Sequence, residues 1–330
     1  MIDVPLSVLD LAPVQFGESV GDGLNATTEA ARQAERLGYA RFWVAEHHNM
    51  PGIASSAPAV LLAHLAANTE TIRVGSGGVM LPNHAPLVIA EQFGTLHALH
   101  PGRIDLGIGR APGTDRATAL ALRRTTEGLS AESFPQELMV LLRYFGGDST
   151  DGIVAVPGIG ENPEIWLLGS SGFSAQLAGM LGVRFAFAHH FSGENTEAAL
   201  ALYRENFRPS DRLERPHAMI AVSAVCADTD DQADLLSRPN ELAFLQLRLG
   251  RRTALPTPEQ AASFPSTPQE REFVAQRRKD QLIGSPATVR RQLDDLLRRT
   301  EPDEVMLNTR IYDLDDRVRS LELIKEKVVA

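Results

Sequence analysis

Residues 72–109 read IRVGSGGVMLPNHAPLVIAEQFGTLHALHPGRIDLGIG and contain one complete strand, helix and strand. An apolar run at 72–81 is followed by helical spacing of apolar and charged residues over 85–100, and a second apolar run occupies 103–109. Two short strands on either side of a helix are typical of a parallel βαβ unit. The stretch therefore predicts an α/β fold in which helices cover a parallel sheet.

The same alternation continues along the chain in both directions. We expect strands at 5–11, 41–46, 72–81, 103–109, 164–169, 183–189, 218–227 and 304–309, with helical segments at 24–38, 85–100, 174–182, 284–299 and 313–328. Eight strands interleaved with helices in 330 residues favour a single (β/α)8 TIM barrel over an open doubly wound sheet. No linker divides the chain, so we expect one domain over 1–330.

Two long insertions follow strand 4 and strand 7 of the expected barrel, at about 111–163 and 228–283. Both follow the carboxyl end of a strand, which is the face where barrel enzymes place their sites. The segment 250–283 is rich in Pro, Ser and Thr, and it could serve as a mobile lid or be a surface excursion without a catalytic role.

Composition excludes several classes of protein. The net charge is -10 and no basic stripe offsets it, which argues against a nucleic-acid-binding protein. No run approaches 18 apolar residues, so no membrane span is expected. A single cysteine, Cys226, excludes an internal disulfide and a Cys-rich zinc site. We expect a protein of the reducing cytoplasm.

Titratable and polar residues gather where the expected strands end. Since the carboxyl ends of barrel strands surround one mouth, these residues are the candidates for chemistry. They are Asp10, Glu46, His47, His48, the segment 80–84, Arg110, Ser170, Ser171, His189, His190, Asn308 and Arg310. His47 and His48 are adjacent, as are His189 and His190, and adjacent side chains of an extended chain point to opposite sides. One histidine of each pair is therefore expected to be structural.

The segment Ser170, Ser171 and Gly172 joins a strand to a helix. Exposed amides at a helix start, small residues and two hydroxyls suit a phosphate group, although one serine could simply cap the helix. Arg110 ends the neighbouring strand and could add a guanidinium to the same anion. Neither region matches the dinucleotide motif G-x-G-x-x-G, which argues against an NAD-type Rossmann site.

Gly75, Gly77 and Gly78 lie inside an expected strand, where glycine weakens a sheet unless the backbone needs it. A flat ring lying against this backbone would explain the three glycines. A bulge that closes the barrel would also explain them.

Five motifs, taken in order, resemble the bacterial luciferase-like flavin-dependent monooxygenases, and in particular the luciferase-family oxidoreductase group 1. They are SVLDLAPV (7–14), WVAEHH (43–48), GGVMLPNHAPL (77–87), LGIGRAPG (106–113) and LLGSSGFSAQLAGMLG (167–182). The resemblance spans nearly the whole chain. It implies a TIM barrel that binds reduced FMN (FMNH2), forms a flavin C4a-peroxide with O2 and oxygenates a small organic substrate.

The resemblance also implies roles for individual residues. His47 matches the acid/base histidine of the family, and Arg110, Ser170, Ser171 and Gly172 match the residues that hold the FMN phosphate. Gly77 and Gly78 lie where the family often has a non-prolyl cis peptide beneath the flavin ring. We expect the substrate to contact residues near the same mouth, namely Asp10, His48, Met80, His84 and His189.

Two residues depart from the luciferase pattern. Gly109 replaces the reactive cysteine of luciferase α subunits, so a light-emitting reaction on a long-chain aldehyde is not implied. Ser170 replaces a glutamate, which bears on the phosphate contacts. The resemblance to the family further implies a separate flavin reductase and a homodimer formed through the helical segments 56–69 and 85–100.

Three alternatives remain at this stage. A barrel of the same fold could use the deazaflavin F420 to transfer a hydride, and a catalytically silent flavin-binding protein would share the motifs. A metal-dependent hydrolase is disfavoured, because that class needs alternate histidines on one strand and an acidic residue on the last strand. In this chain the histidines of each pair are adjacent, and the last strand ends in Asn308. We therefore expect no metal site.

Overall fold

The structure is a computed structural model that describes residue 2 and residues 4–111, 115–123, 133–146 and 152–329. Parts of the first expected insertion, including residues 112 and 113 of the LGIGRAPG motif, lie outside the described residues. Among the described helices, none has the length and apolar character that crossing a bilayer requires.

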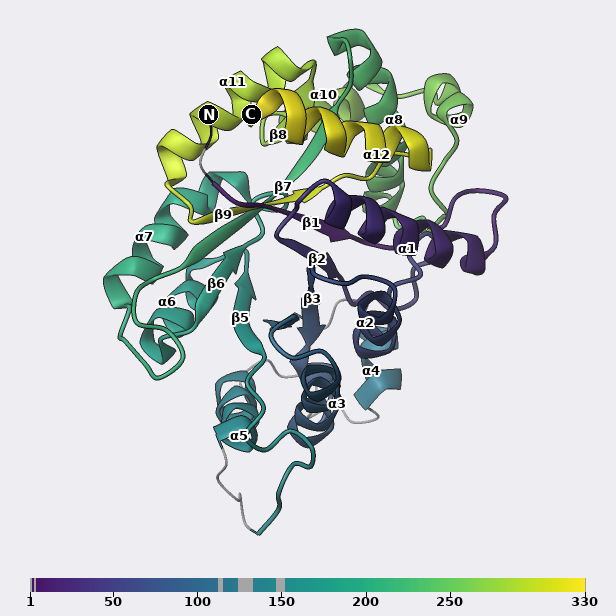
Figure 1. Cartoon of the computed structure of the whole chain (residues 1–330). Coiled ribbons are helices and arrows are strands. Elements are labelled where there is room, and N and C mark those ends of the chain that lie inside the picture. Colours follow the sequence, from purple (N-terminus) through teal and green to yellow (C-terminus); the bar gives the residue numbers. More distant parts are fainter. Residues whose placement is uncertain (1, 3, 112–114, 124–132, 147–151, 330) are drawn as a thin grey trace.

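The chain forms a closed barrel of eight parallel strands, which confirms the predicted (β/α)8 fold (Figure 1). The strands are β1 (Leu6–Asp10), β2 (Arg41–Val44), β3 (Arg73–Met80), β4 (Ile104–Gly109), β5 (Glu164–Gly169), β6 (Arg184–Phe187), β7 (Ala218–Cys226) and β9 (Glu304–Asn308). Each pairs with the next in this order, and β9 pairs with β1 to close the ring. Every barrel strand lies within the range expected for it.

A ninth strand, β8 (Gln281–Gly284), was not expected from the sequence. Strand β7 is nine residues long, and its first part pairs with β6 while its second part, Ser223–Cys226, pairs with β8. The short segment QLIG therefore adds to the sheet only where β7 extends beyond β6. Four residues without a repeating pattern carry no strand signal of their own.

Helices surround the barrel and return the chain between strands (Figure 1). The outer layer consists of α1 (Val20–Arg36), α2 (Pro58–Ala67), α3 (Pro86–Leu99), α6 (Gly172–Leu181), α7 (Thr196–Asn206), α11 (Pro286–Thr300) and α12 (Leu314–Leu323). The described residues also include short turns of other helical types, namely η1 (Leu81–Asn83), η4 (Gly193–Asn195) and η5 (Ile324–Val328).

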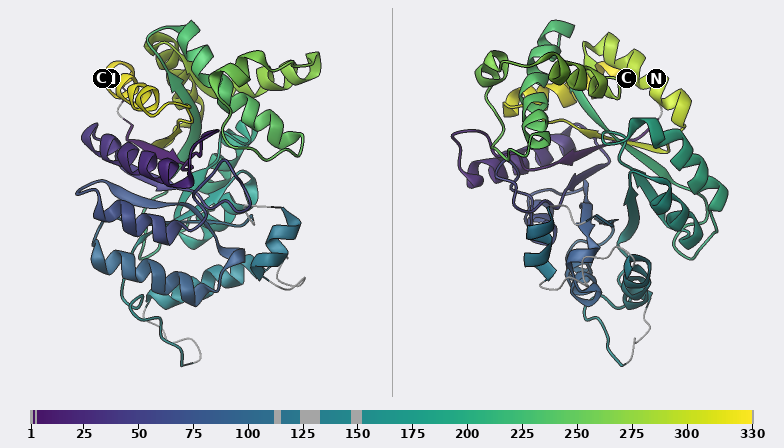
Figure 2. Two further views of the ribbon diagram at one scale, coloured as in Figure 1. Left: turned by 90° about the vertical axis from the view of Figure 1, so that its right-hand side faces the viewer. Right: turned by 180° about the vertical axis from the view of Figure 1, so that it is seen from behind.

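The two insertions carry further helices. The first contains α4 (Arg116–Arg123) and α5 (Phe134–Gly146), and the second contains α8 (Asp230–Arg248), α9 (Pro258–Ser263) and α10 (Pro268–Arg278). Helices α4 and α8–α10 extend to one side of the barrel in the left view of Figure 2. Thr257 and Thr267 form capping boxes that begin α9 and α10, and these two helices make up half of the segment 250–283 that was expected as a lid. Its mobility stays a prediction.

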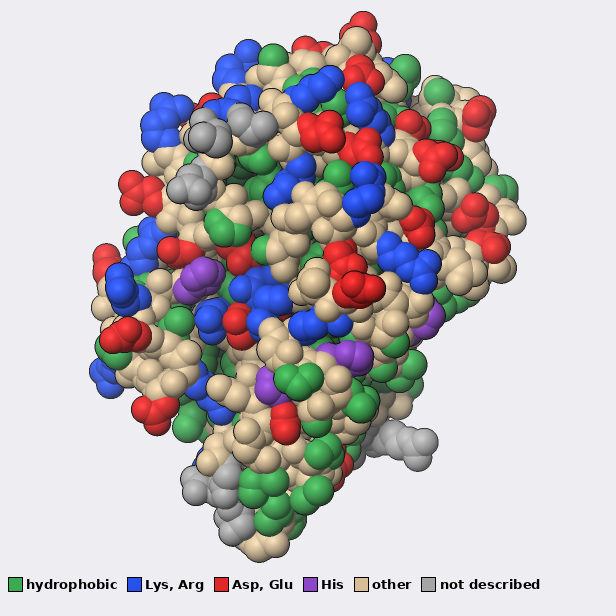
Figure 3. Space-filling model, in the orientation of Figure 1, with side chains coloured by type: hydrophobic (Ala, Val, Ile, Leu, Met, Phe, Trp, Pro, Cys, Tyr) green, Lys and Arg blue, Asp and Glu red, His purple; other side chains and the backbone are tan. Residues whose placement is uncertain are grey.

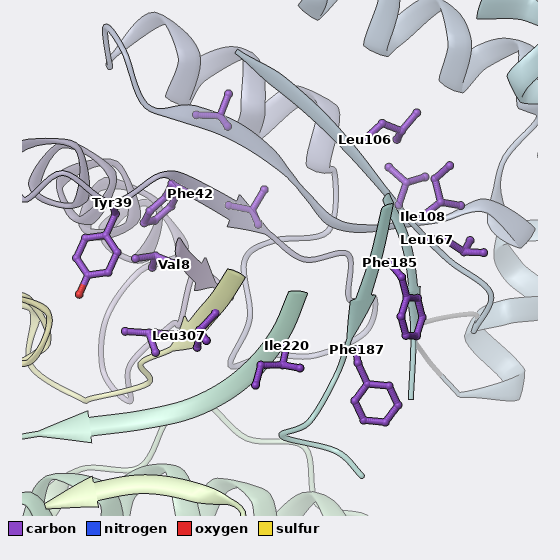
Figure 4. Close-up of a cluster of buried hydrophobic side chains, with 14 of the residues drawn as sticks. Val8, Tyr39, Phe42, Leu106, Ile108, Leu167, Phe185, Phe187, Ile220 and Leu307 are labelled. Atoms are coloured by element: carbon purple, nitrogen blue, oxygen red, sulfur yellow. The ribbon is translucent and has the colours of Figure 1, made fainter. Parts of the chain in front are cut away.

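Alternate residues of each strand face two different apolar layers. Outward side chains pack against the helices, as Figure 4 shows for Val8, Phe42, Leu106, Ile108, Leu167, Phe185, Phe187, Ile220 and Leu307. Inward side chains fill the middle of the barrel, where Leu9, Trp43, Trp166, Ala186, Met219, Ala221 and Met306 form a second cluster. This alternation decides which strand-end residues can reach the barrel mouth.

The amino end of the barrel is closed by an ionic cluster. Arg41 of β2 lies 2.9 Å from Asp105, 2.9 Å from Glu164 and 3.1 Å from Glu304. Trp43 Nε1 donates to Asp105 at 2.8 Å, which ties this cluster to the apolar layer above it. The cluster leaves the opposite, carboxyl end of the barrel as the open end.

Basic and acidic side chains are interspersed over the face that Figure 3 shows, and they do not form one continuous basic stripe there. That face therefore offers no electrostatic footprint for a nucleic acid.

Candidate active site

A cavity of about 260 Å³ lies at the carboxyl end of the barrel. Every barrel strand or the loop after it contributes to its lining, together with helices of the second insertion. The lining residues on which the description below depends are Trp43, His47, Gly77, Gly78, Met80, Arg110, Ser170, Ser171, His190, Phe244, Arg277, Asn308 and Arg310. The apolar remainder includes Leu9, Leu168, Phe187, Phe191, Met219 and Met306.

His47 follows β2 and lines the cavity. Its backbone amide donates to Ser55 O at 2.9 Å, which fixes the residue against the next loop. The ring atom Nδ1 is buried, and no hydrogen-bond partner for it exists within the described ranges. The pKa of His47 is lowered to about 4, chiefly by burial and also by the positive charge of Arg310, while Glu46 opposes both effects. The imidazole is therefore neutral at neutral pH, with a nitrogen available for proton transfer.

His48 turns away from the cavity toward Glu46. Its Nε2 lies 2.9 Å from Glu46 Oε1, and His84 Nε2 lies 3.0 Å from both carboxylate oxygens. Glu46 also accepts from the Met80 amide at 2.9 Å and from Asn83 Nδ2 at 3.0 Å. Of the expected substrate residues His48, Met80 and His84, only Met80 lines the cavity.

Asp10 and His189 also lie outside the cavity lining. Asp10 is buried, accepts from Arg317 Nη1 at 2.9 Å and from Thr27 Oγ1 at 3.0 Å, and so joins β1 to the surrounding helices. His189 Nδ1 lies 2.7 Å from Thr196 Oγ1 at the start of α7. The expected substrate contacts of both residues would require the ligand to reach behind the strands.

His190, and not His189, lines the cavity. Its Nδ1 lies 2.9 Å from Ala221 O, and burial lowers its pKa to about 4, assisted by the charge of Arg277. The two histidine pairs therefore behave alike, since one member of each pair lines the cavity while the other bonds outside it. The expectation that adjacent histidines diverge is confirmed.

Arg110 and the serines after β5 meet at one edge of the cavity. The Arg110 guanidinium carbon lies 4.3 Å from the centroid of the Phe173 ring, so an aromatic face supports it. Ser171 precedes α6 in an extended conformation. Within the described residues, its side chain forms no capping hydrogen bond to the amides of the helix. Gly172 begins α6 and does not line the cavity. This edge presents a cation, two hydroxyls and the amides of a helix start.

Gly77 and Gly78 line the cavity floor, and the peptide bond between them is cis. A Cβ atom at Gly77 would lie 2.8 Å from Leu9 Cδ1, and one at Gly78 would lie 2.7 Å from Gly107 O. The register between β3 and β4 also shifts between Ser76 and Val79. Close packing within the barrel therefore requires these glycines, whether or not a ring lies above them.

Four polar residues of the lining were not among the strand-end candidates: Ser174, Ser223, Asn240 and Arg277. Asn308 and Arg310 were among those candidates without an assigned role, and both line the cavity. Asn308 ends β9 and Arg310 follows it, at positions that alternate with the inward-facing Met306. Asn240 and Arg277 come from α8 and α10, and no pattern in the sequence indicates that these helices reach the mouth.

The family model of the luciferase-like monooxygenases matches residues 5–304. This chain belongs to the luciferase-like monooxygenase family. A luciferase-like monooxygenase of Escherichia coli (strain K12) is 48% identical over 330 residues, which cover 99% of this chain and 98% of the relative. The N-acetyl-S-alkylcysteine monooxygenase of Bacillus subtilis (strain 168) is 34% identical over 340 residues and covers 99% of both chains.

Solved structures share the fold of this luciferase-like monooxygenase. That of apo-MsnO8 is 38% identical with a TM-score of 0.90 and covers 98% of both chains. The oxygenating constituent of 3,6-diketocamphane monooxygenase from Pseudomonas putida, in complex with FMN, has a TM-score of 0.74 at 20% identity, covering 99% of this chain and 98% of that one. The coenzyme F420 dependent tetrahydromethanopterin reductase from Methanopyrus kandleri has a TM-score of 0.66 at 14% identity, with the same coverage. At such identities the last two show the fold alone.

Proposed function

We propose that the protein is a flavin-dependent monooxygenase that uses reduced FMN and O2 to oxygenate a small organic substrate. One observation carries the proposal. The cavity joins an anion-binding edge, formed by Arg110, Ser170 and Ser171, to a neutral buried histidine, His47, whose Nδ1 has no partner among the described residues. Family membership and an FMN-bound neighbour of the same fold support the choice of flavin.

The residues of the cavity fit both the phosphate and the ring of FMN. Arg110 can present its N–H edge to a phosphate because its face rests on Phe173, and the hydroxyls of Ser170 and Ser171 can donate to the remaining oxygens. The apolar walls and the Gly77–Gly78 backbone can face a flat ring. Reduced FMN bound there would supply the electrons for the reaction with O2.

The protein's own part in the reaction is to position, shield and transfer protons. The apolar lining keeps water from the reacting groups. His47, neutral at working pH, can take or give a proton at Nδ1 without first breaking another hydrogen bond. Met80 would contact the substrate from the loop after β3, which Glu46 holds in place.

The proposal includes partners. A separate reductase would deliver reduced FMN in the cytoplasm, because the chain has no dinucleotide motif of its own. A homodimer would form through α2 and α3, where Val60 is 71% exposed and Val88 is 43% exposed. N-acetyl-S-methylcysteine is the first substrate to try, since a relative is named N-acetyl-S-alkylcysteine monooxygenase.

The test is titration of the purified protein with FMN, reduced FMN and F420, with binding followed by their fluorescence. We expect reduced FMN to bind and, with a reductase and substrate, to consume O2. Tight binding of F420 without affinity for FMN in either redox state would favour hydride transfer instead. Binding of FMN with an unchanged rate of O2 consumption across a broad substrate panel would favour a silent flavin-binding protein.

A further inference from the structure

The cavity is strongly cationic although the chain is acidic. Its lining contains Arg110, Arg277 and Arg310, and no Asp or Glu from the described ranges. The chain as a whole has a net charge of -10. Because a charge removed from water is costly without a partner, three arginines at one cavity indicate anionic ligands. The FMN phosphate proposed above would account for Arg110 alone.

Arg310 cannot join Arg110 at one small anion, because the two lie on opposite sides of the mouth. The ring of strands runs β1, β2, β3, β4, β5, β6, β7, β9 and back to β1. Arg110 follows β4 and Arg310 follows β9, and these strands are four places apart in either direction around the ring. An anion bound between Arg110 and Ser170 therefore cannot also be bound by Arg310.

Arg310 forms no ion pair within the described residues, although the charge of Asp10, which is itself paired with Arg317, acts on it. Its Nη2 donates to Gly52 O across 3.4 Å, which is a weak bond. Its Nε is buried without a partner in the described part of the molecule. Burial lowers the pKa of Arg310 to about 10, so the side chain stays charged at neutral pH. Arg310 and His47 both line the cavity, and the charge of Arg310 also lowers the pKa of His47.

Arg277 approaches the cavity from α10, in the insertion that follows β7. Its guanidinium carbon lies 3.3 Å from the ring centroid of Phe244, and Phe244 stacks on Phe273 at 6.1 Å between centroids. Stacking on an aromatic face holds a guanidinium while leaving its N–H edge available to a ligand. Helix α8 lies beside both arginines, because Phe244 carries Arg277 and Leu247, about one turn further along, lines a small pocket together with Arg310.

We propose that the organic substrate carries a carboxylate, and that Arg310 and Arg277 bind this carboxylate on the β7 and β9 side of the cavity. The inference rests on the proposed function, because it reserves Arg110 and the serines for the FMN phosphate. A carboxylate held there would share the cavity with His47 and His190, and the rest of the substrate would extend over the apolar floor. The two guanidinium groups then act as specificity determinants and not as acid/base groups.

The experiment compares benzoate with benzamide, which have nearly the same shape but differ in charge. Each is titrated into the FMN-loaded protein, with the flavin absorption spectrum as the readout. Each is also titrated into the protein without FMN, where the fluorescence of Trp43 in the cavity wall reports binding. We expect benzoate to bind at least tenfold more tightly than benzamide.

Variants connect this preference to the two arginines. Arg310→Met and Arg277→Met are each expected to weaken benzoate about tenfold, to leave benzamide unchanged and to leave FMN affinity unchanged. Arg310→Lys keeps the charge but loses the planar fork, and an intermediate loss is expected. Arg251→Met, at an exposed position outside this cavity, is the matched control. If Arg310→Met does not fold, Arg277→Met tests the same assignment from a helix outside the barrel.

Three results would overturn the carboxylate assignment. They are equal affinity for benzoate and benzamide, no binding of either to the wild-type protein, and a loss of FMN affinity in both variants as large as in Arg110→Met. The last result would assign the arginines to the cofactor. A protein that binds no FMN but keeps the preference for benzoate would instead overturn the proposed function and support the carboxylate site.

Discussion

Glu46 accepts a hydrogen bond from the backbone amide of Met80 at 2.9 Å, and so ties the end of β2 to the end of β3. The same carboxylate, fully buried, binds Asn83 and His84 of the following turn and His48 of its own loop. Met80 and His47 line the cavity from the two segments that Glu46 joins. The position of both cavity residues therefore depends on one carboxylate that does not itself reach the cavity.

Replacing Glu46 by Gln should destabilise the protein substantially. Burial alone would raise the pKa of Glu46, but the hydrogen bond from His84 and its charge, with the donors Asn83 and His48, lower it overall. The amide of Gln would turn a donor toward several other donors, so we expect the free energy of unfolding to fall by about 3 kcal/mol. Urea unfolding near pH 7 measures this loss. Glu29→Gln on the exposed side of α1 is the control, and equal effects of the two changes would contradict the assignment.

The lowered pKa of Glu46 also predicts a direction for pH dependence. A carboxyl group whose pKa is lower in the folded than in the unfolded protein stabilises the fold above its ordinary pKa. That stabilisation is lost as the pH falls through the lowered pKa of the folded state. The difference in unfolding free energy between wild type and Glu46→Gln should therefore shrink below about pH 4.

Arg41 is the residue whose loss should most damage the barrel's amino end. Its side chain is 10% exposed and contacts Asp105, Glu164 and Glu304. Arg41→Met would leave these carboxylates buried without their shared cation, at a cost of about 4 kcal/mol in unfolding free energy. Arg36→Met breaks the exposed pair with Glu322 and should cost less than about 1 kcal/mol. Denaturant unfolding compares the two, and a loss at Arg41 no larger than that at Arg36 would show that the cluster contributes little.

The barrel strands were predictable from the sequence because each is a short apolar run followed by a helical segment. The extra strand β8 was not, because QLIG is stabilised by the part of β7 that extends beyond β6. Its existence depends on a tertiary neighbour and not on its own four residues.

The alternation of inward and outward side chains along a strand, here called strand parity, would have made the site prediction more precise. In β2 the inward positions Trp43 and Ala45 continue to His47, and in β6 the inward Ala186 continues to His190. His48 and His189 have the opposite parity and bond outside the cavity. Asp10 also has the outward parity of β1, since Leu9 and Leu11 line the cavity.

Strand parity cannot predict which residues of the helical insertions reach the cavity. Arg277 reaches the cavity because α10 packs over the carboxyl end of the barrel. The distance between that helix and β9 is set by the fold as a whole. The local sequence QRRKD at 276–280 indicates only a charged helix face.

The two cavity histidines should titrate far below an ordinary histidine. Burial lowers the pKa of both His47 and His190 to about 4. Both imidazoles should therefore stay neutral from pH 8 down to pH 5, and ring signals in two-dimensional NMR spectra should not shift over this range. His47→Ala and His190→Ala assign the signals. Since an unfolded histidine protonates near pH 6.5, stability should fall as the pH drops from about 6.5 toward 4. Titration near pH 6.5 in the folded protein would contradict the burial.

His47 should matter for turnover and not for cofactor binding. His47→Ala removes the nitrogen that can transfer a proton, and general acid/base groups contribute about 100-fold or more to rate. We expect O2 consumption at saturating substrate to slow by at least this order while affinity for reduced FMN changes little. His48→Ala, next to it but outside the cavity, should lower stability more than turnover. Unaltered turnover in His47→Ala would remove the residue from the catalytic assignment.

Arg110 should distinguish FMN from riboflavin, which lacks the phosphate. A guanidinium bound to a phosphate contributes about 1.5–3 kcal/mol, so Arg110→Met should weaken FMN by about 10-fold to 100-fold. Riboflavin should bind the variant and the wild type equally, because its ring would contact the Gly77–Gly78 floor and not Arg110. Quenching of flavin fluorescence measures both affinities. Arg116→Met, at an exposed position of α4, should change neither. Equal losses for FMN and riboflavin in Arg110→Met would mean that the guanidinium supports the cavity wall without binding the phosphate.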